Sequence, residues 1–270
     1  MERLLNIDRR IIFAFIFVGV AVPLLIDFSF PIKPTEPVQR VYDEFERVAS
    51  EDDPVVLLAF SYGASTVPEM QPMSLAILRH AFSRDIKVVA ICLWPEAPGL
   101  AQDALDQVAG EYGKEYGTDY AFLGYKPGLW APIINMGQDF HDAWPRDTQG
   151  TLVGDIPVTA NIRNLNDFNL VFDFAAGDSI EFWWIPFGVE KYKFAFSGGC
   201  TAVMAPDLYP FLQSNQLRGM IGGLAGAGAT LKYVYDRDPT RYEGVLTDHP
   251  GCKAVDSMDE ILADEEVRLV

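Results

Sequence analysis

The sequence predicts an α/β protein with a doubly wound, mostly parallel five-stranded sheet, Rossmann-like or flavodoxin-like, preceded by one N-terminal transmembrane helix. Two observations predict it. Five short apolar runs alternate with helical stretches, and parallel strands need such helices as right-handed crossover connections. In addition, residues 11–26 form an apolar run without a single charge.

The apolar run lies between basic residues and a proline-rich stretch. Extended through residue 30, it gives about 30 Å of helix, close to the hydrocarbon thickness of a bilayer. Arg3, Arg9 and Arg10 precede the run and Lys33 follows it, which places residues 1–10 in the cytoplasm. We therefore expect a signal anchor over residues 11–30 in the cytoplasmic membrane, with a cleaved signal peptide or a buried helix as alternatives.

Beyond the anchor, the chain divides into three parts. Residues 31–37 contain three prolines and predict a stiff spacer. Residues 38–235 form the α/β domain, outside the cytoplasm. Residues 236–270 carry a net charge of -6 and predict an acidic tail, either a solvated terminus or a docking segment.

The domain begins with an amphipathic helix over 38–49 and then alternates strands with helices. Continuous apolar runs bounded by polar residues are typical of strands buried on both faces. The expected strands are 54–60, 87–94, 119–124, 169–174 and 191–196. The expected helices are 69–83, 100–116, a short one over 129–140, a short aromatic helix or turn over 179–187, then 206–212 and 216–233. Trp183 and Trp184 are expected in the core or as membrane-interface anchors.

Composition excludes several functions. The chain has 270 residues, 49% of them hydrophobic and 22% charged, with a net charge of -17, so it is neither a disordered chain nor a nucleic-acid-binding one. Its cysteines and histidines show no zinc spacing, and no nucleotide-binding glycine motif follows the first strand. We therefore predict no metal and no cofactor. The residues concerned are Cys92, Cys200, Cys252, His80, His141 and His249.

Polar residues follow the expected strands, at the edge where such sheets bind ligands. The candidate ligand rim consists of Ser61, Glu96, Lys126, Asp178, Gly198 and Gly199. The glycines could expose amide groups to an anion or form a tight turn, and Cys200 could be a nucleophile with His141 as its base. Ser61 is a second candidate nucleophile, and Asp173 a supporting carboxylate. The sequence leaves open whether Cys200 and Cys252 form a disulfide.

Glycines at four-residue spacing mark the last expected helix. Gly219 and Gly223, and Gly222 and Gly226, allow another backbone to approach closely. The approaching element is either a part of the same domain or a helix of a partner protein.

Three segments carry a resemblance. They are 69–73 (EMQPM), 122–127 (FLGYKP) and 216–223 (QLRGMIGG). Together with the anchor, they resemble a family of bacterial single-pass membrane-anchored proteins of unassigned function. The resemblance implies a single-pass exported protein, implies no activity, and has no counterpart for the acidic tail.

The leading functional hypothesis is a non-catalytic, membrane-anchored binding or structural subunit of a larger membrane-associated assembly. It rests on the anchor, the spacer, the spaced glycines and the acidic tail, together with the lack of a complete catalytic motif. Two alternatives remain open, a membrane-anchored hydrolase or transferase working at the carboxyl ends of the strands, and a sensor domain for a small ligand.

Overall fold

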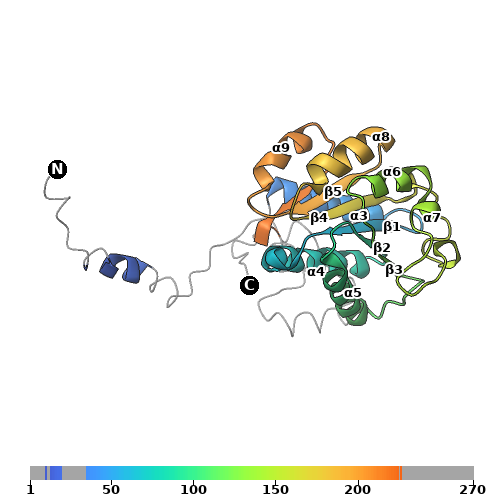
Figure 1. Cartoon of the computed structure of the whole chain (residues 1–270), viewed down its shortest axis with the longest axis horizontal. Coiled ribbons are helices and arrows are strands. Elements are labelled where there is room, and N and C mark those ends of the chain that lie inside the picture. Colours follow the sequence, from blue (N-terminus) through green and yellow to red (C-terminus); the bar gives the residue numbers. More distant parts are fainter. Residues whose placement is uncertain (1–9, 11–12, 20–34, 225, 227–270) are drawn as a thin grey trace.

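In the part of the chain that the structure describes, six parallel strands form one sheet. The computed structural model describes residues 10, 13–19, 35–224 and 226 (Figure 1). The strand order is β3-β2-β1-β4-β5-β6, so the two halves of the sheet run outward from the junction of β1 and β4, as in a Rossmann fold. The strands are β1 (Val55–Ser61), β2 (Lys87–Cys92), β3 (Tyr120–Tyr125), β4 (Leu170–Ala175), β5 (Phe196–Cys200) and β6 (Met220–Gly222).

Helices cover both faces of this sheet (Figure 1). The first face carries α3 (Glu36–Ala49), α4 (Val67–Ser83) and α5 (Ala97–Tyr112), and the second carries α6 (Ala131–Gln138), the π-helix η4 (Ser179–Val189) and α9 (Ala205–Gln213). Shorter elements are α7 (Phe140–Ala143), α8 (Glu190–Tyr192), and the 3-10 turns η1 (Ala64–Thr66), η2 (Val153–Asp155) and η3 (Leu165–Asp167). The prediction of a doubly wound, Rossmann-like α/β domain is confirmed.

Local sequence explains why these elements form. In α3, Val38, Val41, Phe45 and Val48 recur at helical spacing and are all buried. Every residue of β1 is buried, as expected for a central parallel strand with helices on both faces. The helix α5 ends at Tyr112 and is capped by Gly113, which adopts the left-handed conformation that favours glycine.

The second half of the sheet differs from the prediction in two places. The fifth strand, expected at 191–196, lies at Phe196–Cys200, so the glycines expected in a turn belong to a strand. The prediction of a helix over 216–233 is wrong for its first residues, because Met220–Gly222 forms the sixth strand. Both errors have one cause. Glycine has a low intrinsic preference for strands, so glycine-rich segments are not predicted as strands. In this fold the glycines occur in strands because they let helices pack close to the sheet.

The terminal segments lie mostly outside the described residues. The predicted anchor at 11–30 is described at 13–19, which are helical. No helix in the described ranges is long and apolar enough to cross a membrane. The segment 1–10, predicted to be cytoplasmic, is described at Arg10 alone, and the predicted spacer 31–37 is described from Thr35 onward. The acidic tail 236–270 lies outside the described residues.

Candidate functional site

The junction of β1 and β4 holds a buried carboxylate clamped by two serines. Ser61, the last residue of β1, donates to Asp173 Oδ1 at 2.6 Å, and Ser179, the first residue of η4, donates to Asp173 Oδ2 at 2.5 Å. Asp173 is fully buried and both serines are buried. The sequence predicts that Ser61 and Asp173 lie at the same edge of the sheet, and in the structure the two side chains are hydrogen-bonded to each other.

Burial raises the pKa of Asp173 to about 7, and the hydrogen bonds from Ser179 and Ser61 offset only part of that rise. The cluster fixes the start of η4 against the end of β1. Ser61 already donates its hydroxyl hydrogen to a buried acceptor, so the arrangement suits a structural clamp better than an exposed nucleophile.

The turn after β1 is closed by a carboxylate. In a Rossmann fold this turn cradles a phosphate, but here Glu96 Oε2 accepts from the backbone N–H of Ala64 at 3.1 Å. A Cβ atom at Gly63 would lie 2.3 Å from the same oxygen. Glu96 therefore takes the place of an anion, and its charge opposes a second one.

Two further rim candidates do not face a common ligand position. Lys126 Nζ donates to the backbone oxygen of Ala143 and lies 5.3 Å from the centre of the Trp144 ring. Asp178 is exposed and precedes η4. The side chain of Lys126 therefore contacts the irregular segment that follows β3.

The structure does not bring Cys200 and His141 together. Cys200 ends β5 as a buried free thiol, and burial raises the pKa of Cys200 to about 12. His141 Nε2 lies 3.0 Å from Thr159 O, in the segment beside β3. Because β2, β1 and β4 lie between β3 and β5 in the sheet, no Cys-His pair forms. Cys92 is also a buried free thiol, and Cys252 lies outside the described residues, so the disulfide stays untested.

The glycines of β5 and β6 serve close packing. A Cβ at Gly198 would lie 2.6 Å from Ile180 of η4, and one at Gly199 would lie 2.0 Å from the sulfur of Met73 in α4. These two glycines let helices on opposite faces approach β5.

Gly219 lets α3 approach β6 closely, because a Cβ atom at this position would lie 2.5 Å from the backbone nitrogen of Val41. Gly222 ends β6, whereas Gly223 has a φ of 62° and borders Ala202. Gly226 borders Ile221 and Val38. These contacts lie within the domain, and a contact of these glycines with a partner stays a prediction.

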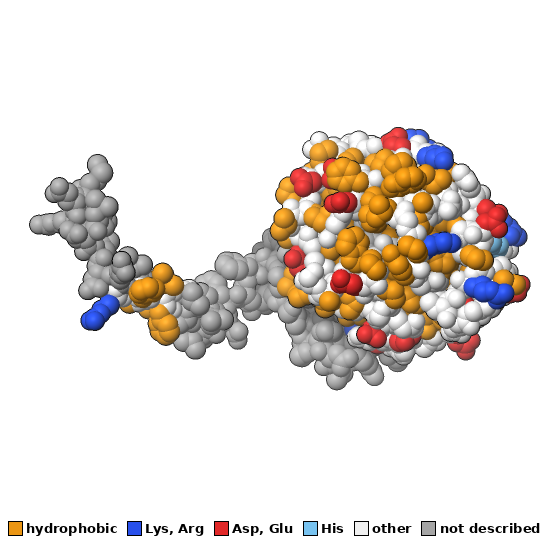
Figure 2. Space-filling view, viewed as in Figure 1, with side chains coloured by type: hydrophobic (Ala, Val, Ile, Leu, Met, Phe, Trp, Pro, Cys, Tyr) orange, Lys and Arg blue, Asp and Glu red, His pale blue; other side chains and the backbone are white. Residues whose placement is uncertain are grey.

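Aromatic side chains gather at the carboxyl edge. We call Trp94, Trp130, Phe182, Trp183 and Phe187 the aromatic rim. Trp94 stacks on Trp183 with ring centres 6.5 Å apart, and Trp130 stacks on Phe187 at 4.7 Å. Phe182 is 56% exposed and Trp130 41%. Figure 2 shows hydrophobic side chains spread over the visible face of the domain, including the region of α6, α8 and α9, with acidic side chains scattered among them.

Two apolar loop tips also lie at the carboxyl edge. Leu129, between β3 and α6, is 57% exposed, and Val203, between β5 and α9, is 85% exposed. Leu129 has a φ of 55°, a left-handed conformation that is unfavourable for a bulky residue. The fold thus holds an apolar side chain outward against the local backbone preference.

Asp173 and Ser61 were predicted from the sequence, whereas Ser179 and most of the rim were not. Ser179 could have been found from its place just after the fourth strand. Trp94 lies two residues after β2, and Trp130 lies in the loop between β3 and α6, so both follow strands in the sequence as the polar rim candidates do. Glu69, also missed, accepts from the backbone N–H of Ala202 at 2.9 Å and ties α4 to the loop after β5.

No group of three or more His, Cys, Asp or Glu residues within the described ranges could hold a metal ion. No protein-family model, curated protein or solved structure matches the chain. The resemblance to bacterial membrane-anchored proteins therefore stays a hypothesis.

Proposed function

We propose that the chain is a non-catalytic, membrane-anchored binding or structural subunit of a larger membrane-associated assembly, in which the α/β domain acts by surface contact. The observation that carries the proposal is the carboxyl edge of the sheet. There the usual ligand position is closed by Glu96 and Asp173 is clamped by serines, while Trp130 and Phe182 of the aromatic rim are exposed.

Aromatic side chains support a contact role because Trp, Tyr and Phe are enriched at the centres of interfaces, where they bury much apolar area. Soluble monomers expose few large contiguous apolar patches. The sequence adds the apolar run at 11–26 and the proline-rich spacer, which attach such a surface to a membrane.

The test is the composition of the native protein after mild detergent extraction, measured by size exclusion with light scattering and by mass spectrometry. A fixed stoichiometry with other membrane proteins is the expected result. A lone monomer or homodimer in the extract contradicts the proposal.

A thiol probe tests the enzymatic alternative. Because Cys200 is buried and its pKa is raised, the folded chain should leave Cys200 unlabelled near neutral pH until denaturant is added. Rapid labelling of Cys200 in the folded chain would support the hydrolase or transferase instead.

A further inference from the structure

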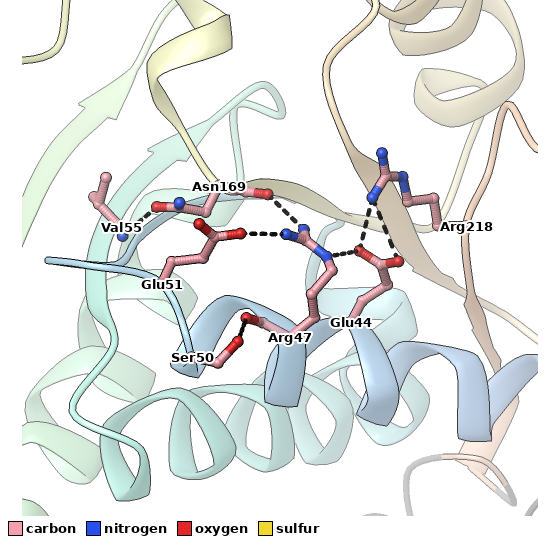
Figure 3. Close-up of polar contacts among 7 residues, drawn as sticks. All are labelled: Glu44, Arg47, Ser50, Glu51, Val55, Asn169 and Arg218. Atoms are coloured by element: carbon pink, nitrogen blue, oxygen red, sulfur yellow. Dashed lines mark hydrogen bonds and ion pairs between the residues drawn. The ribbon is translucent and has the colours of Figure 1, made fainter.

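The helix α3 shows at which edge the domain is attached to the preceding chain. Near its end, Arg47 donates to the backbone oxygen of Asn169 at 3.0 Å, just before β4 begins (Figure 3). Near its start, Val38 borders Gly226, which follows the end of β6. The 14 residues of α3 span about 21 Å, so α3 begins at the carboxyl edge of the sheet and ends at the amino edge.

The length of the chain before α3 limits how far that edge can lie from a bilayer. If residues 11–30 span the membrane, residues 31–35 connect the span to α3, and five residues reach at most about 18 Å even when fully extended. The carboxyl edge is then the edge nearest to the membrane, and it is also the edge that carries the aromatic rim.

The chemistry of the two edges fits this orientation. Trp residues favour the membrane interface, where an aromatic ring meets both lipid and water. The opposite edge carries the charged side chains of Glu44, Arg47 and Arg218 (Figure 3), which favour water. Leu129 and Val203 add exposed apolar surface on the rim side.

We propose that the carboxyl edge of the sheet lies against the lipid headgroup layer, with Trp130 and Phe182 of the aromatic rim, Leu129 and Val203 in contact with the lipid interface. This inference rests on the proposed membrane anchor and names the partner of the rim as lipid. Glu96, Asp178 and Asp207 are exposed at the same edge, so the lipid it fits is zwitterionic rather than anionic.

The experiment places a fluorophore at each edge of the full chain. In a Cys252→Ser background, Cys92 and Cys200 are buried thiols, so a single introduced cysteine accepts the label. Phe182→Cys and Val203→Cys report on the carboxyl edge, and Ser50→Cys, exposed at the end of α3, is the matched control. Each labelled chain is reconstituted at one copy per phosphatidylcholine nanodisc, with and without nitroxide-labelled lipid.

The expected result is a severalfold fall in fluorescence at residues 182 and 203 when nitroxide lipid is present, with little change at residue 50. Replacing part of the phosphatidylcholine by phosphatidylglycerol should not strengthen the quenching. Val203→Cys keeps the test valid if Phe182→Cys does not fold, because the side chain of Val203 is almost entirely in solvent.

The outcomes separate the two proposals. A chain that does not associate with the nanodisc at all overturns both the anchor and the membrane contact. A chain that associates but shows equal, weak quenching at all three positions overturns the membrane contact and leaves the anchor standing. A blue-shifted probe at residue 182 without nitroxide quenching also overturns it, because the rim is then covered by protein.

Discussion

At the amino edge of the sheet, Glu44 accepts hydrogen bonds from both Arg47 and Arg218 (Figure 3). The carboxyl edge combines exposed aromatic side chains, Trp130 and Phe182, with the buried carboxylate of Asp173. The first edge is held by half-exposed ion pairs, which water screens. The second is held by apolar packing and by hydrogen bonds away from water, which are harder to replace. We therefore expect substitutions at the two edges to differ in size and in their response to pH and salt.

The largest effect is expected from Trp184→Ala. Trp184 is fully buried in η4 and stacks on Phe196 with ring centres 5.6 Å apart. Removing it from a packed core should lower the free energy of unfolding by about 3–5 kcal/mol. Urea unfolding of the full chain in mild detergent, followed by far-ultraviolet circular dichroism, measures the change.

Phe182→Ala is the control, because Phe182 lies on the same helix but faces outward. Its effect should stay within about 0.5 kcal/mol. An equal loss in both variants would mean that Phe182 is part of the core and not of a contact surface.

The next effect is a change in the pH dependence of stability in Asp173→Asn. The pKa of Asp173 is raised from 3.8 to about 7, so the folded state holds the proton more tightly than the unfolded state. The free energy of unfolding should therefore fall as pH rises through this window and level off above about 7, by an amount on the order of 4 kcal/mol.

Asparagine does not titrate, so Asp173→Asn should remove this fall and leave the slope contributed by other groups. The matched control is Asp178→Asn, because Asp178 is exposed five residues further along the chain. Urea unfolding at several pH values between 4 and 8 measures the slopes. Parallel curves for the wild type and Asp173→Asn would contradict a raised pKa at this carboxyl.

The first four strands were predictable from sequence because apolar runs such as 55–61 allow few alternatives in an α/β chain. The fifth and sixth strands were not predictable, because glycines such as Gly198 and Gly199 disfavour a strand. Only the structure shows that Ile180 and Met73 occupy the space that side chains at these two positions would fill. The Asp173 clamp was half predictable, because strand order decides that β1 and β4 are neighbours. Most of the rim escaped prediction because exposure of an aromatic residue depends on packing around it.

A smaller effect is expected from Leu129→Asn. Leu129 has a φ of 55°, in the left-handed region. A non-glycine residue there costs about 1–2 kcal/mol of conformational free energy, and asparagine costs less. The variant should be more stable by about 0.5–1 kcal/mol, while it removes one of the apolar side chains proposed to contact lipid. Thermal unfolding in detergent gives the stability, and the nanodisc quenching assay gives the contact.

Leu152→Asn is the matched control, because Leu152 is also exposed but has an ordinary φ of -63°. It should change neither the stability nor the quenching. Equal stabilisation by both variants would show that the gain comes from the removal of exposed apolar surface and not from relief of the backbone at residue 129.

The smallest effect belongs to the amino edge, in a double-mutant cycle of Arg218→Ala and Glu44→Ala. The two side chains are 3.1 Å apart, and 37% of Arg218 and 18% of Glu44 are exposed. Because water reaches the pair, the coupling energy should be about 0.2–1 kcal/mol and should fall as salt is raised. Arg47 also donates to Glu44, so it can partly replace Arg218 and keep the coupling low. A coupling that is large and independent of salt would mean that this edge is shielded from water, and the amino edge would then become the better candidate for a covered surface.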